Sequence, residues 1–396
     1  MELTALETIV DTWSYWERDV PPSIRRDIPG FPDRLSPDLV HVIQGVRRCG
    51  KSTFLSQLLE RLSIEKNCAT FVNFEDPRLT NHLTTDLLDA ILAIAQVRGA
   101  QGQQLFLFLD EVQNVLGWEK WLHLKTARPS NVHYVVTGSN SKLLSGELST
   151  ALTGRHITTE LFPFNYNEYQ RATDKRLSDY LENGGFPRVQ SYENPKQLLR
   201  EYFTDIVEKN VRQHMATKSN LTLQQLFQLI FESVGSELSL RKMAATLDTT
   251  PDTVGQYVDA GMAAYLIQAV PYFAYSEKKR LVRNRKFYAI DTGMRNAVTT
   301  RPGRDVGKNF ENLVFLSIRR FTKEIYYWRN RGEVDFIVRT PNGVLPIQVS
   351  WDGVKQRHMD AIEEFKVLNP DALDAVYVTE ESYEAFVGFI SVLLTT

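Results

Sequence analysis

A short glycine-containing motif near the N-terminus constrains the fold of this chain more than any other feature. Gly45-Val-Arg-Arg-Cys-Gly50-Lys51-Ser52 has the spacing G-x-x-x-x-G-K-S, with an apolar run before it and a helical pattern after it. Glycines at this spacing let successive backbone N–H groups converge on phosphate oxygens at a helix N-terminus, where the helix dipole favours an anion. The sequence therefore predicts a strand, a phosphate-binding loop and a helix. The alternative is a chance match to a loose pattern.

The residue types in this loop indicate a nucleoside triphosphate, ATP, with its Mg²⁺ ion. We expect Lys51 to contact the β and γ phosphates and Ser52 to bind the metal ion. We interpret Cys49 as a small residue tolerated in the loop rather than a redox switch, since no neighbouring sequence feature lowers the pKa of its thiol. The residues that we expect around the nucleotide are Gly45, Arg47, Arg48, Cys49, Gly50, Lys51, Ser52 and Thr53.

Apolar runs alternate with helical patterns between residues 39 and 139. The runs are LVHVIQG, ATFVNFED, LFLFLDE and VHYVVTGS, and they are separated by helices expected from Ser52, over 84–98 and over 118–127. Strands that are apolar throughout, rather than alternating, are typical of a parallel sheet covered on both faces. We therefore predict an α/β fold with a parallel sheet behind the phosphate-binding loop.

Two carboxylates follow the third apolar run, Leu105-Phe-Leu-Phe-Leu-Asp110-Glu111. This places Asp110 at the C-terminal end of a strand, where α/β sheets bind ligands. We expect Asp110 to hold the Mg²⁺ shell and Glu111 to polarise the attacking water, although an acidic strand end can also simply cap the next helix. The next strand ends in Thr137, Ser139 and Asn140, which are suited to holding that water or the γ-phosphate; a plain turn is the alternative for Asn140.

The rest of the 396 residues is long enough for two to four domains. We expect an N-terminal helix and lead-in over 1–36, the nucleotide-binding core over 37–170, a helical region over 171–235, a winged helix over 236–305 and a last domain over 306–396. Two cysteines exclude a disulfide framework or a four-ligand zinc site within the chain. No apolar run reaches the roughly 18 residues of a membrane span and no signal-peptide pattern occurs, so we expect a cytoplasmic protein with no membrane partner.

A basic segment lies inside the expected winged helix. Helices are expected from Ser239 and after Thr249-Thr250-Pro251, and strands are expected on either side of a basic hairpin. With a net charge of −2 over the whole chain, a nucleic-acid surface has to be a local patch of this kind. DNA is therefore the expected partner, the alternative being a solvated turn used for packing or oligomerisation. The basic residues are Lys278, Lys279, Arg280, Arg283, Arg285 and Lys286.

The chain resembles the AAA+ ATPases, in particular the prokaryotic group that joins such a core to a C-terminal nuclease-like domain. The stretches that carry the resemblance are GVRRCGKST, FVNFEDPRL, LFLFLDEVQNVLGWEKWL, VVTGSNSKLLSGELSTALTGRHITTELFPFNYNEY, YLENGGFPRV and FENLVF with GEVDFIV. The resemblance implies that Arg155, in Thr153-Gly154-Arg155, acts as an arginine finger or sensor at a subunit boundary. It therefore also implies a homo-oligomer, for which a hexamer is one form; a surface ion pair is the alternative role for Arg155.

The last domain resembles the PD-(D/E)XK nuclease fold. Active members place two carboxylates and a lysine around a divalent metal ion. Glu311 and Asp335 match this pattern, but Gln348 stands where the second acid is expected and Ser350 where the lysine is expected. Lys355 follows five residues later and would need an unusual geometry to replace it. We therefore expect a domain that keeps the shape of a nuclease without its activity.

These features together predict a Mg²⁺-dependent ATP hydrolase that couples turnover to binding or remodelling of DNA, branched DNA included. Two alternatives stay open. One is a nucleotide-controlled switch or scaffold for a protein partner, and the other is a nuclease regulated by ATP.

Overall fold

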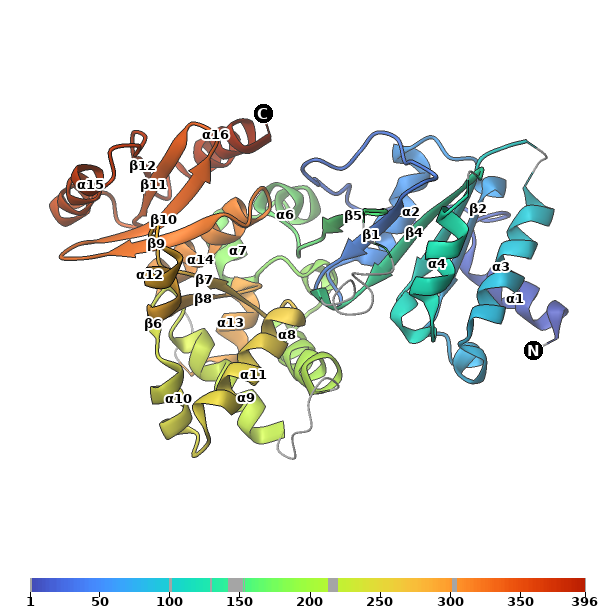
Figure 1. Ribbon diagram of the computed structural model, residues 1–396, viewed down its shortest axis with the longest axis horizontal. Helices are drawn as coiled ribbons and strands as arrows, with labels where there is room; N and C mark the ends of the chain where they lie inside the picture. Colours follow the sequence, from blue (N-terminus) through green and yellow to red (C-terminus); the bar gives the residue numbers. More distant parts are fainter. Residues whose placement is uncertain are drawn as a thin grey trace. The chain divides into compact units, whose positions relative to one another are not determined.

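The computed structural model describes residues 2–99, 102–128, 130–141, 152, 154–212, 220–300 and 305–395, and the chain forms two compact units (Figure 1). The first unit comprises Met1–Arg26 and Phe31–Leu161, and the second comprises Asp27–Gly30 and Phe162–Thr396. The α/β fold predicted from the sequence is confirmed.

A five-stranded parallel sheet forms the centre of the first unit. Its order is β2-β3-β4-β1-β5, and every neighbouring pair is parallel. All residues of β1, β3 and β4 are buried, as the uninterrupted apolar runs predict. The strands are β1 Val40–Gln44, β2 Ala69–Asn73, β3 Leu105–Asp110, β4 Val132–Gly138 and β5 His156–Glu160; the helices are α1 Leu3–Trp13, α2 Lys51–Arg61, α3 Thr85–Arg98 and α4 Trp118–Thr126.

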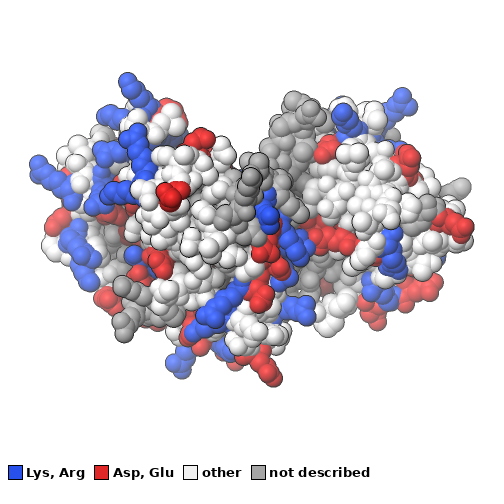
Figure 2. All heavy atoms as spheres, turned by 90° about the horizontal axis from the view of Figure 1, so that it is seen from below, with Lys and Arg blue, Asp and Glu red and all other residues white. Residues whose placement is uncertain are grey.

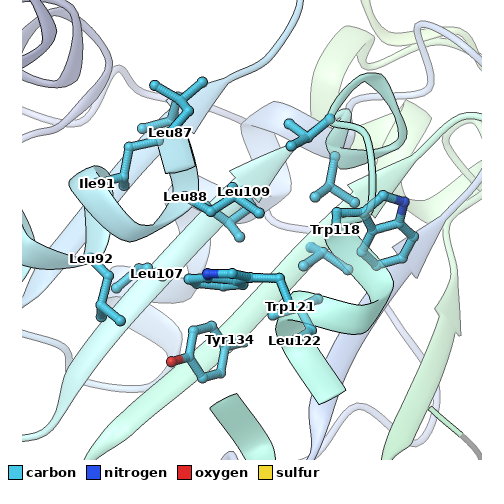
Figure 3. Close-up of a cluster of buried hydrophobic side chains, with 14 of the residues drawn as sticks. Leu87, Leu88, Ile91, Leu92, Leu107, Leu109, Trp118, Trp121, Leu122 and Tyr134 are labelled. Carbon is cyan, nitrogen blue, oxygen red and sulfur yellow. The ribbon is translucent and has the colours of Figure 1, made fainter. Parts of the chain in front are cut away.

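Helices α3 and α4 bury their apolar sides against β3 and β4 (Figure 3). Trp121 of α4 packs edge-to-face on Tyr134 of β4, with ring centroids 5.7 Å apart, and its indole N–H donates to Asp89 of α3. Leu88 of α3 is fully buried beside them, so truncating it to alanine is expected to cost about 2–5 kcal/mol. This core holds β3 and β4 in register, so the residues that follow them meet at one sheet edge.

The second unit begins with helices and ends with a mixed sheet. Its helices are α6 Tyr166–Thr173, α7 Leu177–Asn183, α8 Pro195–Asp205, α9 Asn220–Glu232, α10 Leu240–Thr246, α11 Pro251–Ala263, α12 Glu277–Val282, α13 Thr292–Val298, α14 Val306–Arg319, α15 Gln356–Leu368 and α16 Tyr383–Thr395, with a π-helical turn at Ile206–Val211. One sheet has the order β6-β8-β7 and the other β12-β11-β10-β9. Their strands are β6 Glu237–Leu238, β7 Ile267–Val270, β8 Arg285–Ala289, β9 Ile325–Arg329, β10 Glu333–Thr340, β11 Gly343–Val349 and β12 Val376–Val378.

A buried aspartate anchors α13 to the segment after α7. Asp291 caps the N-terminus of α13 by accepting the Met294 N–H, and its other oxygen accepts the Gly185 N–H at 2.6 Å. A Cβ at Gly184, which has φ +72°, would lie 2.1 Å from the same carboxylate. The adjacent glycines are therefore needed for the close approach of this buried carboxylate to the backbone.

The basic segment is not the hairpin that the sequence predicts. The helix over Pro251–Ala263 with Thr250 as its N-cap is confirmed, and a strand does follow at Arg285. Between the strands, however, Glu277–Val282 forms α12, because Ser276 caps its N-terminus and Arg280 pairs with Glu277 one turn away. The two predicted strands, β7 and β8, do pair antiparallel, but the basic segment that joins them contains a helix rather than a hairpin turn, so that part of the prediction was wrong.

Candidate functional site

The phosphate-binding loop connects β1 to α2. Gly50 is the N-cap of α2 with φ +99°, and Arg48 also has a positive φ of +69°. A Cβ at Gly45 would lie 2.0 Å from the carbonyl oxygen of Leu161, so this position cannot accommodate a side chain without a shift. The strand, loop and helix predicted from the motif are confirmed, and α2 begins at Lys51.

The ammonium group of Lys51 lies within the loop. The side chain is buried, and Nζ donates to the carbonyl oxygens of Gly45 at 3.1 Å and Val46 at 3.4 Å. Nζ is also 3.4 Å from Oε1 of Glu111. Burial by itself would lower the pKa of Lys51, but the charge of Glu111 and its neighbours outweighs burial and raises that pKa. Lys51 therefore stays charged and can exchange these partners for phosphate oxygens.

Asp110 ends β3 at the centre of a hydrogen-bond network. Its Oδ2 accepts from Ser52 Oγ at 2.6 Å and from Asn73 Nδ2 at 3.2 Å, and its Oδ1 accepts from Thr137 Oγ1 at 2.5 Å. Burial, followed by the charge of Glu111, raises the pKa of this carboxyl. The structure thus brings Ser52 and Asp110 into direct contact, and their role as Mg²⁺ ligands stays a prediction.

This donor set fits Mg²⁺ bound together with a nucleotide. A hydroxyl and one carboxylate are hard oxygen ligands of the kind Mg²⁺ prefers, and phosphates and water complete its shell in phosphoryl-transfer sites. No group of three or more histidine, cysteine, aspartate or glutamate residues that could hold a metal ion by itself occurs in the described ranges. Ser52 and Asp110 would hold the ion, which would neutralise charge on the phosphates.

Glu111 occupies the position next to the phosphate-binding loop. Its backbone has φ +55° and its N–H donates to Thr137 Oγ1 at 2.9 Å. Oε2 accepts from Gln113 Nε2 at 2.5 Å, while Oε1 faces Lys51. The sequence suggested that Thr137 holds water or phosphate, but its hydroxyl is used to orient Asp110 and Glu111. Asn73 and Gln113 were missed; a polar residue that ends β2 was the available signal for Asn73.

The remaining loop residues have different surroundings. Arg47 pairs with Glu75 at 2.6 Å, and the Cys49 thiol is fully buried with its sulfur 3.3 Å from the carbonyl oxygen of Leu161. Burial raises the pKa of the Cys49 thiol, which favours the inert interpretation. Arg26 Nη1 donates to the Cys49 carbonyl at 2.9 Å, a contact that the sequence did not reveal. The expected contacts of Arg48 and Thr53 with the nucleotide stay predictions.

Asn140 and Arg155 lie at opposite ends of the sheet. Asn140 is buried and follows the end of β4 by two residues, at the same edge of the sheet as the phosphate-binding loop. Its role stays a prediction. Arg155 precedes β5, whose first residue pairs with Val40 at the start of β1. Since β1 spans five residues, Arg155 is about 15 Å from the loop of its own chain. The role of Arg155 stays a prediction, and Thr153 lies outside the described residues.

The basic residues around α12 are not equally accessible. Lys278, Lys279 and Arg283 are exposed, whereas Arg285 is half-buried. Arg280 is half-buried as well and is paired with Glu277 and Tyr326. The side chain of Lys286 is 1% exposed and lies among carboxylates, so it cannot reach a phosphate backbone and is removed from the predicted DNA-binding set.

The structure gathers most of the expected nuclease-like residues in the second unit. Asp335 Oδ2 accepts from Gln348 Nε2 at 2.5 Å, and burial, followed by the charge of Glu311, raises the pKa of Asp335. Ser350 does not join them, because its hydroxyl donates to the Gly353 carbonyl at 2.6 Å. Lys355 is the N-cap residue of α15.

Comparisons with protein-family models match three consecutive segments of the chain. Residues 38–170 match the AAA domain, residues 174–305 match a domain of unknown function (DUF8612), and residues 306–393 match another domain of unknown function (DUF4143). None of these matches describes the C-terminal segment as a nuclease.

Related proteins cover most of the chain. An uncharacterised protein of Methanocaldococcus jannaschii, MJ1544, is 30% identical over 397 residues, which cover 91% of this chain and 86% of MJ1544. An uncharacterised protein of Haemophilus influenzae is 28% identical over 342 residues, covering 81% of this chain and 84% of the relative. An uncharacterised protein of Mycobacterium tuberculosis, Rv2008c, is 26% identical over 334 residues, which cover 80% of this chain and 69% of Rv2008c.

Two solved structures align with parts of the chain at low similarity. PCH-2 of C. elegans has 14% identity and a TM-score of 0.26, covering 56% of this chain and 60% of PCH-2. The replication initiator DnaA bound to AMPPCP and single-stranded DNA has 17% identity and a TM-score of 0.30, and the alignment covers 58% of this chain and 84% of the DnaA chain. Scores this low carry no argument about the site.

No helix in the described part of the chain has both the length and the apolar character needed to cross a membrane.

Proposed function

Since the chain belongs to the family of MJ1544 and carries an AAA domain over residues 38–170, we propose that it is a Mg²⁺-dependent ATP hydrolase. The observation that carries the proposal is the contact of Ser52 Oγ with Asp110 Oδ2 at 2.6 Å, beside a loop that holds a buried, charged lysine. A hydroxyl, a carboxylate and an ammonium placed together in this way are the parts that a nucleoside triphosphate with its metal ion requires.

Each residue of the site has a distinct task in this proposal. Lys51 leaves the loop carbonyls and neutralises charge on the β and γ phosphates, while backbone N–H groups at the start of α2 contact the phosphates. Glu111, released from Lys51, accepts a proton from the attacking water. Thr137 donates to the Asp110 carboxylate and accepts the backbone N–H of Glu111, which fixes both residues in place, and Asn140 contacts the γ-phosphate or the water.

Arg155 completes the site of a neighbouring subunit in this proposal. Arg155 directly precedes β5, whose first residue pairs with the first residue of β1, so its backbone lies at the far end of β1 from its own loop. A guanidinium can spread positive charge over a transferring phosphoryl group. The active form is therefore a homo-oligomer, and a hexamer is one arrangement in which every site receives such an arginine.

Hydrolysis is coupled to DNA through the surface around α12. Lys278, Lys279 and Arg283 are exposed there, and Leu281 and Val282 beside them are 76% and 75% exposed. Cations next to exposed aliphatic side chains suit a phosphate backbone with partly unstacked bases, including junctions. Elsewhere basic and acidic side chains are interspersed over the face drawn in Figure 2, so a local patch is the relevant feature. The winged-helix segment over 236–305 would carry this contact, and the domain over 306–396 would not cleave DNA.

The test is the rate of ATP hydrolysis with single-stranded, duplex and junction DNA at a stated salt concentration. We expect stimulation by at least one DNA form, with junctions the most effective. Turnover that no DNA changes, together with nucleotide-controlled assembly, would instead favour a switch or scaffold for a protein partner.

A further inference from the structure

A lysine lies among the carboxylates of the second unit. Lys286 is the second residue of β8, and its Nζ is 2.6 Å from Glu333 Oε1 and 3.6 Å from Glu311 Oε1. Glu311 comes from α14, and Glu333 and Asp335 come from β10. Three separate elements therefore converge on one buried ammonium group.

The groups around this ammonium are held by further contacts. Tyr288 donates its hydroxyl to Glu311 Oε1 at 2.7 Å, and a Cβ at Gly235 would lie 2.7 Å from Glu311 Oε2. Asp335 Oδ2 accepts from the Val349 N–H at 2.8 Å and from Gln348. The pairing of β9 with β10 shifts register between Val334 and Ile337, the stretch that contains Asp335. The carboxylates are thus fixed before any ligand arrives.

Electrostatics keep the lysine charged in this position. Burial alone would lower the pKa of Lys286, but Glu311, Asp335 and Glu333 outweigh burial and raise it. Burial and then the charge of Glu311 raise the pKa of Asp335 to about 8. The cluster therefore contains a cation of its own.

The resemblance to nucleases implies a divalent metal ion between Glu311 and Asp335, and the residues present do not fit one. The second acid is replaced by Gln348, a neutral amide, and the space beside Glu311 already holds a positive charge. A divalent ion at the same place would meet the full repulsion of a buried ammonium.

We propose that the ammonium of Lys286 is the resident cation of this cluster. It occupies the place of a divalent metal ion and prevents the carboxylates from binding such an ion. Its role is to tie β8 to α14 and β10, and β8 directly follows the basic segment around α12. The proposal concerns the second unit alone and does not depend on ATP hydrolysis or DNA binding.

The test uses the full chain without nucleotide and compares wild type with Lys286→Met, a substitution of similar length that removes the charge. Breaking a buried ion pair leaves uncompensated carboxylates, so we expect the thermal midpoint to fall by roughly 10 °C. Lys278→Met, which removes an exposed lysine on α12, is the matched control and should leave the midpoint unchanged. An unchanged midpoint in Lys286→Met would overturn the proposal.

Mn²⁺ then tests the metal-replacement step. Wild type and Asp335→Asn should show identical Mn²⁺ binding by electron paramagnetic resonance, because neither admits metal to the cluster. Mn²⁺ should raise the thermal midpoint of the Lys286→Met variant by several degrees. Adding Asp335→Asn to that variant should abolish the rise. No gain would overturn the claim that the lysine occupies a metal position.

The wild-type measurement keeps the proposal testable even where Lys286→Met does not fold. Mn²⁺ binding to wild type that is lost in Asp335→Asn would overturn it, as would metal-dependent DNA cleavage lost in the same variant. Failure of ATP hydrolysis alone would leave this result untouched and would count only against the proposed function.

Discussion

Replacing Glu111 with glutamine separates water activation from nucleotide binding. Without nucleotide, Glu111 Oε1 lies 3.4 Å from Lys51 Nζ, and both side chains are buried. Coulomb's law gives about 5 kcal/mol for this pair at an effective dielectric constant of 20, much of it offset by desolvation. A bound triphosphate has to compete with Glu111 for the ammonium. Removing the competitor should therefore leave ATP affinity unchanged or raise it by up to about tenfold.

Hydrolysis should respond in the opposite direction to binding. A glutamine amide cannot accept the proton of the attacking water, and a positioned general base typically contributes about 10²- to 10⁴-fold. That loss corresponds to roughly 3–5 kcal/mol in the activation free energy.

Two assays separate these effects, namely titration with a fluorescent ATP analogue and single-turnover phosphate release. Gln113→Ala is the matched control, because it removes only the hydrogen bond to Oε2 and should reduce turnover far less. Undiminished phosphate release in Glu111→Gln would refute the base role. A large loss of ATP affinity would show instead that Glu111 is needed to shape the loop.

Thr137→Val removes the hydroxyl that donates to the Asp110 carboxylate and accepts the Glu111 N–H, so phosphate release should fall about 10- to 100-fold with little change in ATP affinity, measured by the same two assays. Arg155→Ala should fold and bind ATP yet hydrolyse it slowly, and mixing it with the glutamine variant should restore some activity; normal turnover by a monomer would contradict the role across subunits. Replacing Lys279 and Arg283 with glutamate should weaken duplex binding and reduce the slope of log affinity against log salt concentration by about 1.8. Unchanged affinity and slope would show that the surface is only solvated. Burial raises the pKa of Asp291 to about 6, so the folded state loses stability as pH rises from about 4 through 6. Relative to Asp291→Asn, wild type should lose about 3 kcal/mol of unfolding free energy between pH 4 and 8 in denaturant titrations.

The sequence was sufficient for the parts of the fold that depend on local patterns. The loop between β1 and α2 follows from glycine spacing, and the position of Asp110 follows from a strand that is apolar to its last residue. The N-cap at Thr250 was equally readable, because a hydroxyl before Pro251 starts a helix. The same signal at Ser276 was overridden by the count of basic residues after it, and this produced the mistaken hairpin.

Contacts between distant segments were out of reach of the sequence. Lys286 reads as one more residue of a basic run, and only the packing of β8 beside α14 and β10 turns it into the partner of Glu311 and Glu333. Thr137 likewise reads as a polar strand end, whereas the register of β3 and β4 places its hydroxyl against Asp110. In both cases the residue type was noted and its partner was not, because the partner depends on the tertiary fold.

The most direct measurement of the central claim is phosphate release from ATP by the purified wild-type chain and by Lys51→Ala, each with Mg²⁺ and with a chelator. The account predicts release only by wild type and only with Mg²⁺, since Lys51 neutralises the phosphates and Ser52 with Asp110 holds the ion. Equal release by Lys51→Ala, or release by wild type that persists without Mg²⁺, would contradict it.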